Sequence, residues 1–252
     1  MPNSKPFFRI VRGFVPSNNS GWSSWQYMRH PRYAASPRRY IQGYLMIQKD
    51  LEVILEYIQA TDENARSYGY RIHELLMRTC VEIEANLKAI LRANKYKRAP
   101  SDLNMKDYVR VEKSHHLSSY EVFLPIWDGL LSEFAPFESW RNDNPLPWYK
   151  AYNDSKHDRH DGLVKANLHT LVQAIGGLLV LLTAQFGGEN FSAGSDHLSL
   201  GADLYKWKPA TGTLFRIKYP NDWTQDELYN FDWKDLIVLD QPFEKFDYDA
   251  VL

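Results

Sequence analysis

The sequence has little of several features that would narrow its function directly. It contains one cysteine, Cys80, which excludes an intrachain disulfide and favours a reduced compartment. Lys and Arg number 30 against 31 for Asp and Glu, so the chain has no charge excess that would draw it to nucleic acid or to an anionic membrane. It also has no phosphate loop, no dinucleotide-binding glycine pattern and no internal repeat. A disulfide scaffold and the common nucleotide-binding motifs are therefore excluded.

A long apolar run is missing as well. The most apolar segment, residues 171–186, reads LVQAIGGLLVLLTAQF and contains Gln173 and Gln185. It is shorter than the ~20 apolar residues that a membrane span needs, so we expect a buried core helix. The opening residues, MPNSKPFFRI, lack the apolar core of an export signal. These features predict a cytoplasmic protein with no membrane association.

Apolar residues at helical spacing predict a helical bundle over residues 40–188. The expected helices cover residues 40–58, 72–91, 105–113, 147–159 and 163–186. Cys80 falls on the apolar stripe of the second helix, where a small buried thiol is expected. Pro147 suits the entrance of the fourth helix. Gly176 and Gly177 indicate either a kink in the last helix or a point where another helix approaches it closely.

The two ends of the chain differ from this body. Residues 1–39 hold five prolines and many aromatic residues, which predicts an irregular arm. Residues 1–50 contain eight basic residues and one acidic residue, and residues 201–252 contain six basic and ten acidic residues. The arm is expected either to pack against the acidic end of its own or a neighbouring chain, or to bind single-stranded nucleic acid between its rings and arginines. The candidate nucleic-acid contacts are Arg29, Arg32, Arg38 and Arg39.

Residues 189–252 are expected to form a small appendage that contains β structure. The run TGTLFRIKYP at residues 211–220 alternates like an edge strand, and DLIVLD at residues 235–240 is a second short apolar run. The predicted fold class is therefore mainly α: a helical bundle with an irregular N-terminal arm and a small C-terminal β-containing appendage.

The segment with most chemical content is WYKAYNDSKHDRHDGLVKANL, residues 148–168. Helical spacing places Tyr149, Asn153 and either Lys156 or His157 on one face, with Tyr152 next to Lys156. An imidazole can transfer protons, and a neighbouring cation can stabilise the charge that develops on a phosphate. The alternative is that His157 and Asn153 bond to the preceding helix or to the arm.

The text YNDSKH at residues 152–157, the following apolar helix and the earlier helix VEIEANLKAIL at residues 81–91 resemble the HEPN superfamily. The resemblance implies a metal-independent ribonuclease, of the toxin or defence type, that joins two motif copies in a homodimer and needs no cofactor. It also implies that Asn153 orients the site and that His157 assists attack by a 2′-hydroxyl on the adjacent phosphate. Tyr152 stands where the family has an arginine, so Lys156 or Arg159 would supply the positive charge. The alternative is a non-catalytic dimerisation or interaction module.

Two metal hypotheses compete with this one. The run HDRHD at residues 157–161 resembles the ligand set of metal-dependent phosphohydrolases, although its surroundings do not match that family. Glu74, Glu82 and Glu84 suggest a carboxylate-bridged metal bundle, but no Glu-x-x-His pair completes it. The sequence therefore favours RNA chemistry without a metal.

Overall fold

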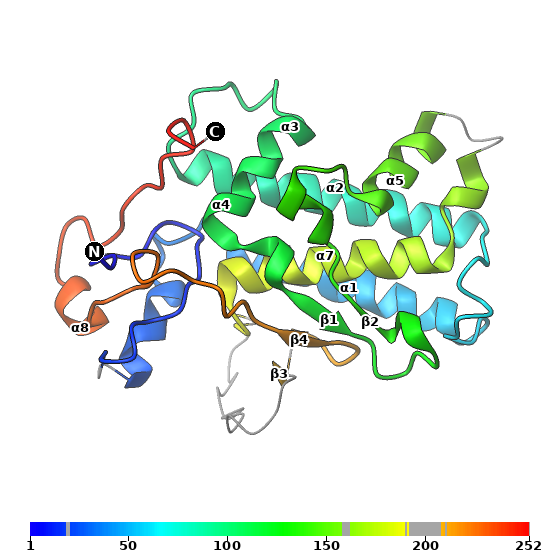
Figure 1. Ribbon diagram of the computed structural model, residues 1–252, viewed down its shortest axis with the longest axis horizontal. Coiled ribbons are helices and arrows are strands. Elements are labelled where there is room, and N and C mark those ends of the chain that lie inside the picture. The colour runs from blue at the N-terminus through cyan, green and yellow to red at the C-terminus, as the bar shows by residue number, and fades with distance from the viewer. Residues whose placement is uncertain (19–20, 158–161, 190, 192–207, 210, 252) are drawn as a thin grey trace.

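The computed structural model describes residues 1–18, 21–157, 162–189, 191, 208–209 and 211–251. Most of its regular structure is helical, so the protein is mainly α (Figure 1). Its longer helices are α1 (Pro37–Leu55), α2 (Tyr70–Ala93), α5 (Pro147–His157) and α7 (Leu168–Phe186). Shorter α-helices are α3 (Met105–Tyr108), α4 (Glu112–His115) and α8 (Trp233–Leu236). The 3-10 helices are Gly21–Arg29, Val109–Val111, Leu117–Ser119, Leu130–Ser132, Glu138–Asn142 and Leu163–Lys165.

Helix α7 forms the centre of the core, as predicted. Every residue from 174 to 186 is buried, and α1, α2 and α5 pack around the helix. By length and composition this helix could cross a membrane, but 83% of its apolar window lies buried inside the protein. Burial of each large aliphatic side chain stabilises the fold by roughly 1.5–3 kcal/mol. The core of the bundle therefore depends on this one helix.

The predicted helices are present, but two of them are divided, and residues 158–159 of the fourth lie outside the described residues. The expected helix 163–186 is divided, because the side chain of Asn167 accepts a hydrogen bond from the Thr170 amide at 3.0 Å and caps a new helix. The expected helix 105–113 is likewise divided into α3, a 3-10 turn and α4. Asn104 and Asp107 form a capping box at the start of α3, which holds that turn in place.

The two glycines in α7 mark a close approach, and one of them is much the more crowded. A Cβ at Gly176 would lie 2.5 Å from the ring of Phe134, whereas a Cβ at Gly177 would meet Trp148 at an ordinary 3.4 Å. Trp148 is fixed there because its indole N–H donates to the carbonyl of Pro136 at 2.7 Å. The absence of a side chain at Gly176 allows the sheet to lie against α7.

That sheet is small and antiparallel, with strand order β2-β1-β4-β3. Its strands are β1 (Glu121–Phe123), β2 (Glu133–Phe134), β3 (Lys208–Pro209) and β4 (Arg216–Lys218). Val122 in β1 lies opposite Phe134 on one side and Ile217 on the other. The expected strand in TGTLFRIKYP is thus present as β4, which pairs with β1 of the body and with β3.

The second short apolar run, DLIVLD, forms no strand among the described residues. Asp232 caps the amide of Lys234 at 3.0 Å, and this cap starts helix α8 just before the run. Leu236 ends the helix, and the next three residues, Ile237, Val238 and Leu239, are exposed. Only the first two residues of the run, Asp235 and Leu236, therefore belong to a helical turn.

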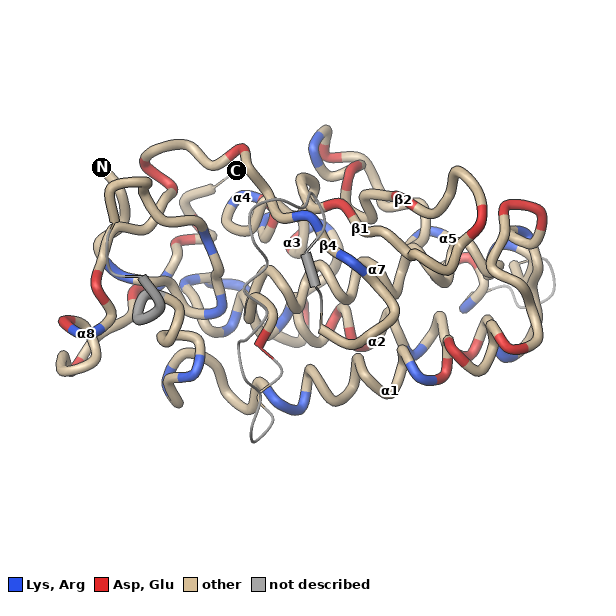
Figure 2. Tube along the Cα trace, turned by 90° about the horizontal axis from the view of Figure 1, so that it is seen from below, with Lys and Arg blue, Asp and Glu red and all other residues tan. Residues whose placement is uncertain are grey.

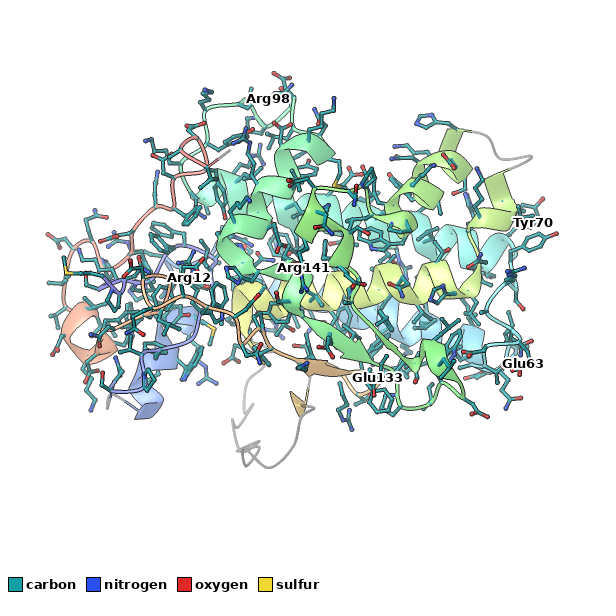
Figure 3. The ribbon with its side chains drawn as sticks, in the orientation of Figure 1. Arg12, Glu63, Tyr70, Arg98, Glu133 and Arg141 are labelled. Atoms are coloured by element: carbon teal, nitrogen blue, oxygen red, sulfur yellow. The ribbon has the colours of Figure 1, made fainter. Side chains whose placement is uncertain are left out.

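The N-terminal arm packs against the C-terminal segment. Isolated bridges pair Asn3 with Tyr229 and Phe7 with Glu244. Arg12 lies where these two segments meet (Figure 3), and its guanidinium donates to the carbonyl of Glu227 at 3.1 Å. Rings from both segments pack together, among them Phe7, Phe14, Tyr27, Tyr229 and Phe231. The intramolecular packing expected of an aromatic arm is present.

Candidate functional site

The motif segment folds as helix α5, which presents one face to the core and leaves the other open. Trp148, Ala151, Tyr152 and Ser155 are buried. This spacing of three and four residues directs them towards α2 and α7, which pack against α5. The buried rings of Trp148 and Tyr152 therefore fix which face of the motif helix points to the core.

A chain of polar contacts joins α5 to α2. The hydroxyl of Tyr149 donates to a carboxylate oxygen of Glu84 at 2.9 Å. The rings of Tyr149 and Tyr152 lie 5.3 Å apart. The Nζ atom of Lys156 donates to the hydroxyl of Tyr152 at 3.3 Å and lies 5.2 Å from the centre of its ring. The predicted adjacency of Tyr152 and Lys156 is confirmed.

The electrostatics of this group follow from its partial burial. Burial raises the pKa of Tyr149 and of Tyr152, and the Glu84 carboxylate raises both further. The hydrogen bond to Tyr152 raises the pKa of Lys156. Both phenols thus stay protonated and Lys156 stays charged at neutral pH. Burial also raises the pKa of the Cys80 thiol, which excludes it as a nucleophile here.

The remaining motif residues lie on the open side of α5. Lys156 and His157 are exposed in its last turn, and Asn153, one turn earlier, is half-buried. Within the described part of the chain, neither Asn153 nor His157 forms a hydrogen bond or an ion pair. The alternative in which these two side chains bond to the preceding helix or to the arm has no contact to support it. Arg159 falls in residues 158–161, outside the described residues.

The histidine that does support α5 is one that the motif does not include. His73, in the first turn of α2, is buried, and its Nε2 atom lies 3.3 Å from the carbonyl oxygen of Ser155. This contact satisfies a carbonyl near the end of α5, where intrahelical partners run out. Gly162 lies against the backbone of Asp154 and Ser155, because a Cβ there would approach within 2.7 Å.

The metal hypotheses gain no support from the described residues. Among them, no group of three or more His, Cys, Asp and Glu side chains is placed to hold a metal ion. Most of the HDRHD run lies outside the described residues. Glu84 accepts a hydrogen bond from Tyr149, and Glu82 lies beside Gly43 of α1. Glu82 and Glu84 thus make contacts between helices, whereas Glu74 forms an ion pair with Arg71 on its own helix.

The four arginines of the arm do not act together. Arg29 forms an ion pair of 2.5 Å with buried Glu189. Arg32 donates to the backbone of Asp240 and to the side chain of Gln241 at 3.1 Å. Arg38 and Arg39 are exposed in the first turn of α1.

The arm and α5 also lie towards opposite ends of the long axis of the molecule, as Figure 1 shows. Figure 3 places Arg12 of the arm towards one end of this axis and Tyr70, at the start of α2, towards the other. The first turn of α2 contacts α5 through His73. Within one chain, therefore, the arm does not extend the motif.

Sequence reasoning did not find the contact between Tyr149 and Glu84. The two residues are 65 positions apart. The sequence does place Glu84 beside the apolar stripe of α2, and it places Tyr149 one turn before Asn153 on α5. Only the packing of α2 on α5 brings the two side chains together.

Compared with models of known families, with curated proteins and with solved structures, the chain shows no match.

Proposed function

We propose that the protein is a HEPN-like, RNA-binding ribonuclease that works without a metal, with its site on the open side of α5. The observation that carries the proposal is the state of the motif side chains. Lys156 and His157 are consecutive exposed residues in the last turn of α5, and Asn153 has no partner among the described residues. A free imidazole next to a cation is the minimum that phosphodiester transfer needs.

In this mechanism His157 accepts the proton of a 2′-hydroxyl while that oxygen attacks the adjacent phosphorus. The bond from phosphorus to the 5′-oxygen breaks, and the leaving oxygen takes up a proton. The products are a 2′,3′-cyclic phosphate and a free 5′-hydroxyl. Lys156, held by Tyr152, would stabilise the negative charge on the phosphate, and Asn153 would orient it by hydrogen bonds. Arg159 would add a second positive charge.

The test is incubation of the purified chain with single-stranded and structured RNA in EDTA. We expect cleavage that resists chelation and falls by roughly 100- to 10,000-fold in His157→Ala. Lys150→Ala serves as the control, because Lys150 is exposed on the same helix but outside the motif. Equal cleavage by the His157→Ala variant and the wild type would refute the catalytic proposal. Cleavage that requires added metal would favour the HDRHD hypothesis instead.

A non-catalytic interaction module is the second candidate, and one observation favours it. The ring of Tyr152 is only 3% exposed, so the residue at the family's arginine position contributes to the packing of α5 and presents no charge. Absence of RNA cleavage by the wild type, with the helical fold intact by circular dichroism, would support this candidate.

Both candidates include a homodimer around α5 in the cytoplasm. The exposed half of α5 would face its symmetry mate and bring two copies of the motif together. Light scattering at micromolar concentration should give twice the mass of one chain, 29.5 kDa. A mass of one chain would refute the dimer.

A further inference from the structure

A histidine outside the motif connects the helical body to the C-terminal segment. The ring of His116, just after α4, lies between two carboxylates: its Nδ1 atom is 3.1 Å from an oxygen of Asp222, and its Nε2 atom is 2.9 Å from an oxygen of Glu227. The ring also stacks on the indole of Trp223, with 4.0 Å between the ring centres. Figure 2 shows acidic and basic positions interspersed at the end of the molecule where the arm and the C-terminal segment meet. One side chain therefore attaches residues 222–227 to the end of α4.

The backbone at His116 adopts a conformation that histidine rarely takes. Its φ of 49° and ψ of 45° lie in the left-handed region, which glycine and asparagine enter more easily. The His116 amide donates to the carbonyl of Glu112 at 2.9 Å and closes the last turn of α4. The ring is only 17% exposed, so it is held inside the junction. The contacts of the ring offset the backbone strain at this position.

The two contacts of the ring require its doubly protonated form. An ionised carboxylate only accepts hydrogen bonds, whereas a neutral imidazole has one N–H donor and one lone pair. Burial raises the pKa of Asp222, but hydrogen bonds from Ser119, at 2.6 Å, and from His116 lower it by more. Burial acts in the same way on Glu227, and bonds from the amide and hydroxyl of Thr224 and from His116 again lower its pKa. Both carboxyls thus stay ionised near neutral pH, and a neutral imidazole would turn its lone pair towards one of them.

The other charged groups around His116 belong to α4 and to the arm. Glu112 of α4 interacts with the imidazole, and burial raises the pKa of that carboxyl. Arg12 of the arm lies 5.4 Å from the ring centre of Trp223, on which His116 stacks. The neighbouring His115 adds no charge near neutral pH, because burial lowers its pKa to about 3. His116 therefore faces three carboxyl groups and one permanent cation, a balance that favours the imidazolium.

The segment held by His116 also holds the N-terminal arm. The side chain of Asn3 donates to the carbonyl of Asp226 at 2.9 Å. The amide of Tyr229 donates to the carbonyl of Gly13 at 2.9 Å. Loosening of residues 222–227 would therefore weaken the attachment of the arm as well.

We propose that His116 is a pH-dependent clasp, which holds residues 222–227 on the helical body while its imidazole carries two protons and loosens them when it loses one. Imidazole side chains exchange this proton between about pH 5 and 8. The attached state binds one proton more than the loosened state. Attachment is therefore complete at the acidic end of this range and is lost as the pH rises through it. The clasp does not depend on the RNA chemistry proposed for α5.

Hydrogen exchange of the full-length chain, followed by mass spectrometry, measures the attachment. Protection of the amides of residues 222–229 is compared at pH 5.5 and pH 8.5, after correction for the chemical exchange rate. We expect the wild type to lose about tenfold in protection of this segment at pH 8.5, while the amides of α7 stay protected. His116→Asn suits the left-handed backbone but carries no charge, so it should show the same low protection at both pH values.

Two further variants separate charge from structure. His30→Asn is the matched control, because half-buried His30 packs on Trp233 and its Nδ1 atom accepts from the Arg32 amide at 3.2 Å, so its loss should leave the pH dependence intact. Glu227→Gln places an amide that can donate to the lone pair of a neutral ring, so the segment should stay protected at pH 8.5.

Four results would each overturn the proposal. They are equal protection of residues 222–229 at both pH values in the wild type, a wild-type pH dependence in His116→Asn, loss of that dependence in His30→Asn, and loss of protection at pH 8.5 in Glu227→Gln. The Glu227→Gln result keeps the proposal testable even if His116→Asn fails to fold.

Discussion

Replacement of Gln185 by leucine tests whether the buried polar contacts around Arg9 hold the arm on the helical body. Gln185 is fully buried near the end of α7. Its Oε1 atom accepts from Arg9 at 2.6 Å, and its Nε2 atom donates to the side chain of Asn86 at 3.0 Å. Burial lowers the pKa of Arg9, which reflects the cost of keeping a guanidinium out of water. One side chain thus joins the arm, α2 and α7.

In Gln185→Leu, a donor on Arg9 and an acceptor on Asn86 both lose their partner. Each unsatisfied buried group costs about 1–3 kcal/mol, and the new leucine recovers part of this through apolar burial, so we expect a net loss of about 3 kcal/mol. For a chain of this size the melting temperature should fall by roughly 6–12 °C. Urea unfolding followed by circular dichroism and tryptophan fluorescence measures the change.

Gln173→Leu is the matched control, because Gln173 lies on the same helix but is only half-buried, with His169 as its partner at 3.3 Å. It should change the free energy of unfolding by less than about 1 kcal/mol. The double variant Arg9→Met/Gln185→Leu should be more stable than the sum of its single changes predicts, because it removes both partners. If Gln185→Leu is no less stable than the control, or if the two changes are additive, the reasoning is refuted.

Two further predictions concern pH and packing. Burial lowers the pKa of His115 to about 3, so the folded chain keeps it neutral while the unfolded chain protonates it near its ordinary 6.5. Stability should therefore fall as the pH drops below 6.5, by about 2 kcal/mol at pH 5, and His115→Gln should remove this part of the dependence in urea titrations; an unchanged dependence would contradict the assignment. Alanine at Gly176 would press on Phe134, whereas alanine at Gly177 makes ordinary contacts and gains helix propensity, so Gly176→Ala should melt at the lower temperature in calorimetry. Equal melting temperatures would show that the Phe134 ring simply moves aside.

Much of the helical body could be predicted because its signals are local. The apolar stripe of α2, which contains Cys80, predicts a helix from neighbouring residues alone, and so does the apolar run of α7. A close approach at the two glycines of α7 was one of two options, but it was expected from a helix, and the residue that crowds Gly176 is Phe134 of strand β2. Strand β1 was missed because it has only three residues, and its partner Ile217 lies in a different part of the sequence.

The candidate site was predictable only along α5. Helical spacing was enough to place Tyr152 beside Lys156, four positions on. It could not show that Tyr149 reaches Glu84 on another helix, since that contact depends on how α2 packs. Nor could the basic composition of the arm show that Arg29 is paired with Glu189. Contacts between distant segments depend on tertiary packing, and the residue pattern of one helix carries no information about how that helix packs on others.

Because the arm pairs with the C-terminal segment, the arm cannot complete its folding during synthesis until that segment has been made. The side chain of Asn3 bonds to the carbonyl of Leu228, which is made 225 positions later. At ribosomal rates of about 5–20 residues per second, the arm waits roughly 10–45 s for that partner. The helices between them can assemble first and already offer the arm a contact, because Arg9 binds Gln185 of α7, but the C-terminal rings that pack on the arm are made later. In the nascent chain, the aromatic rings of the arm are therefore accessible to chaperones and proteases until the segment around Leu228 has been made.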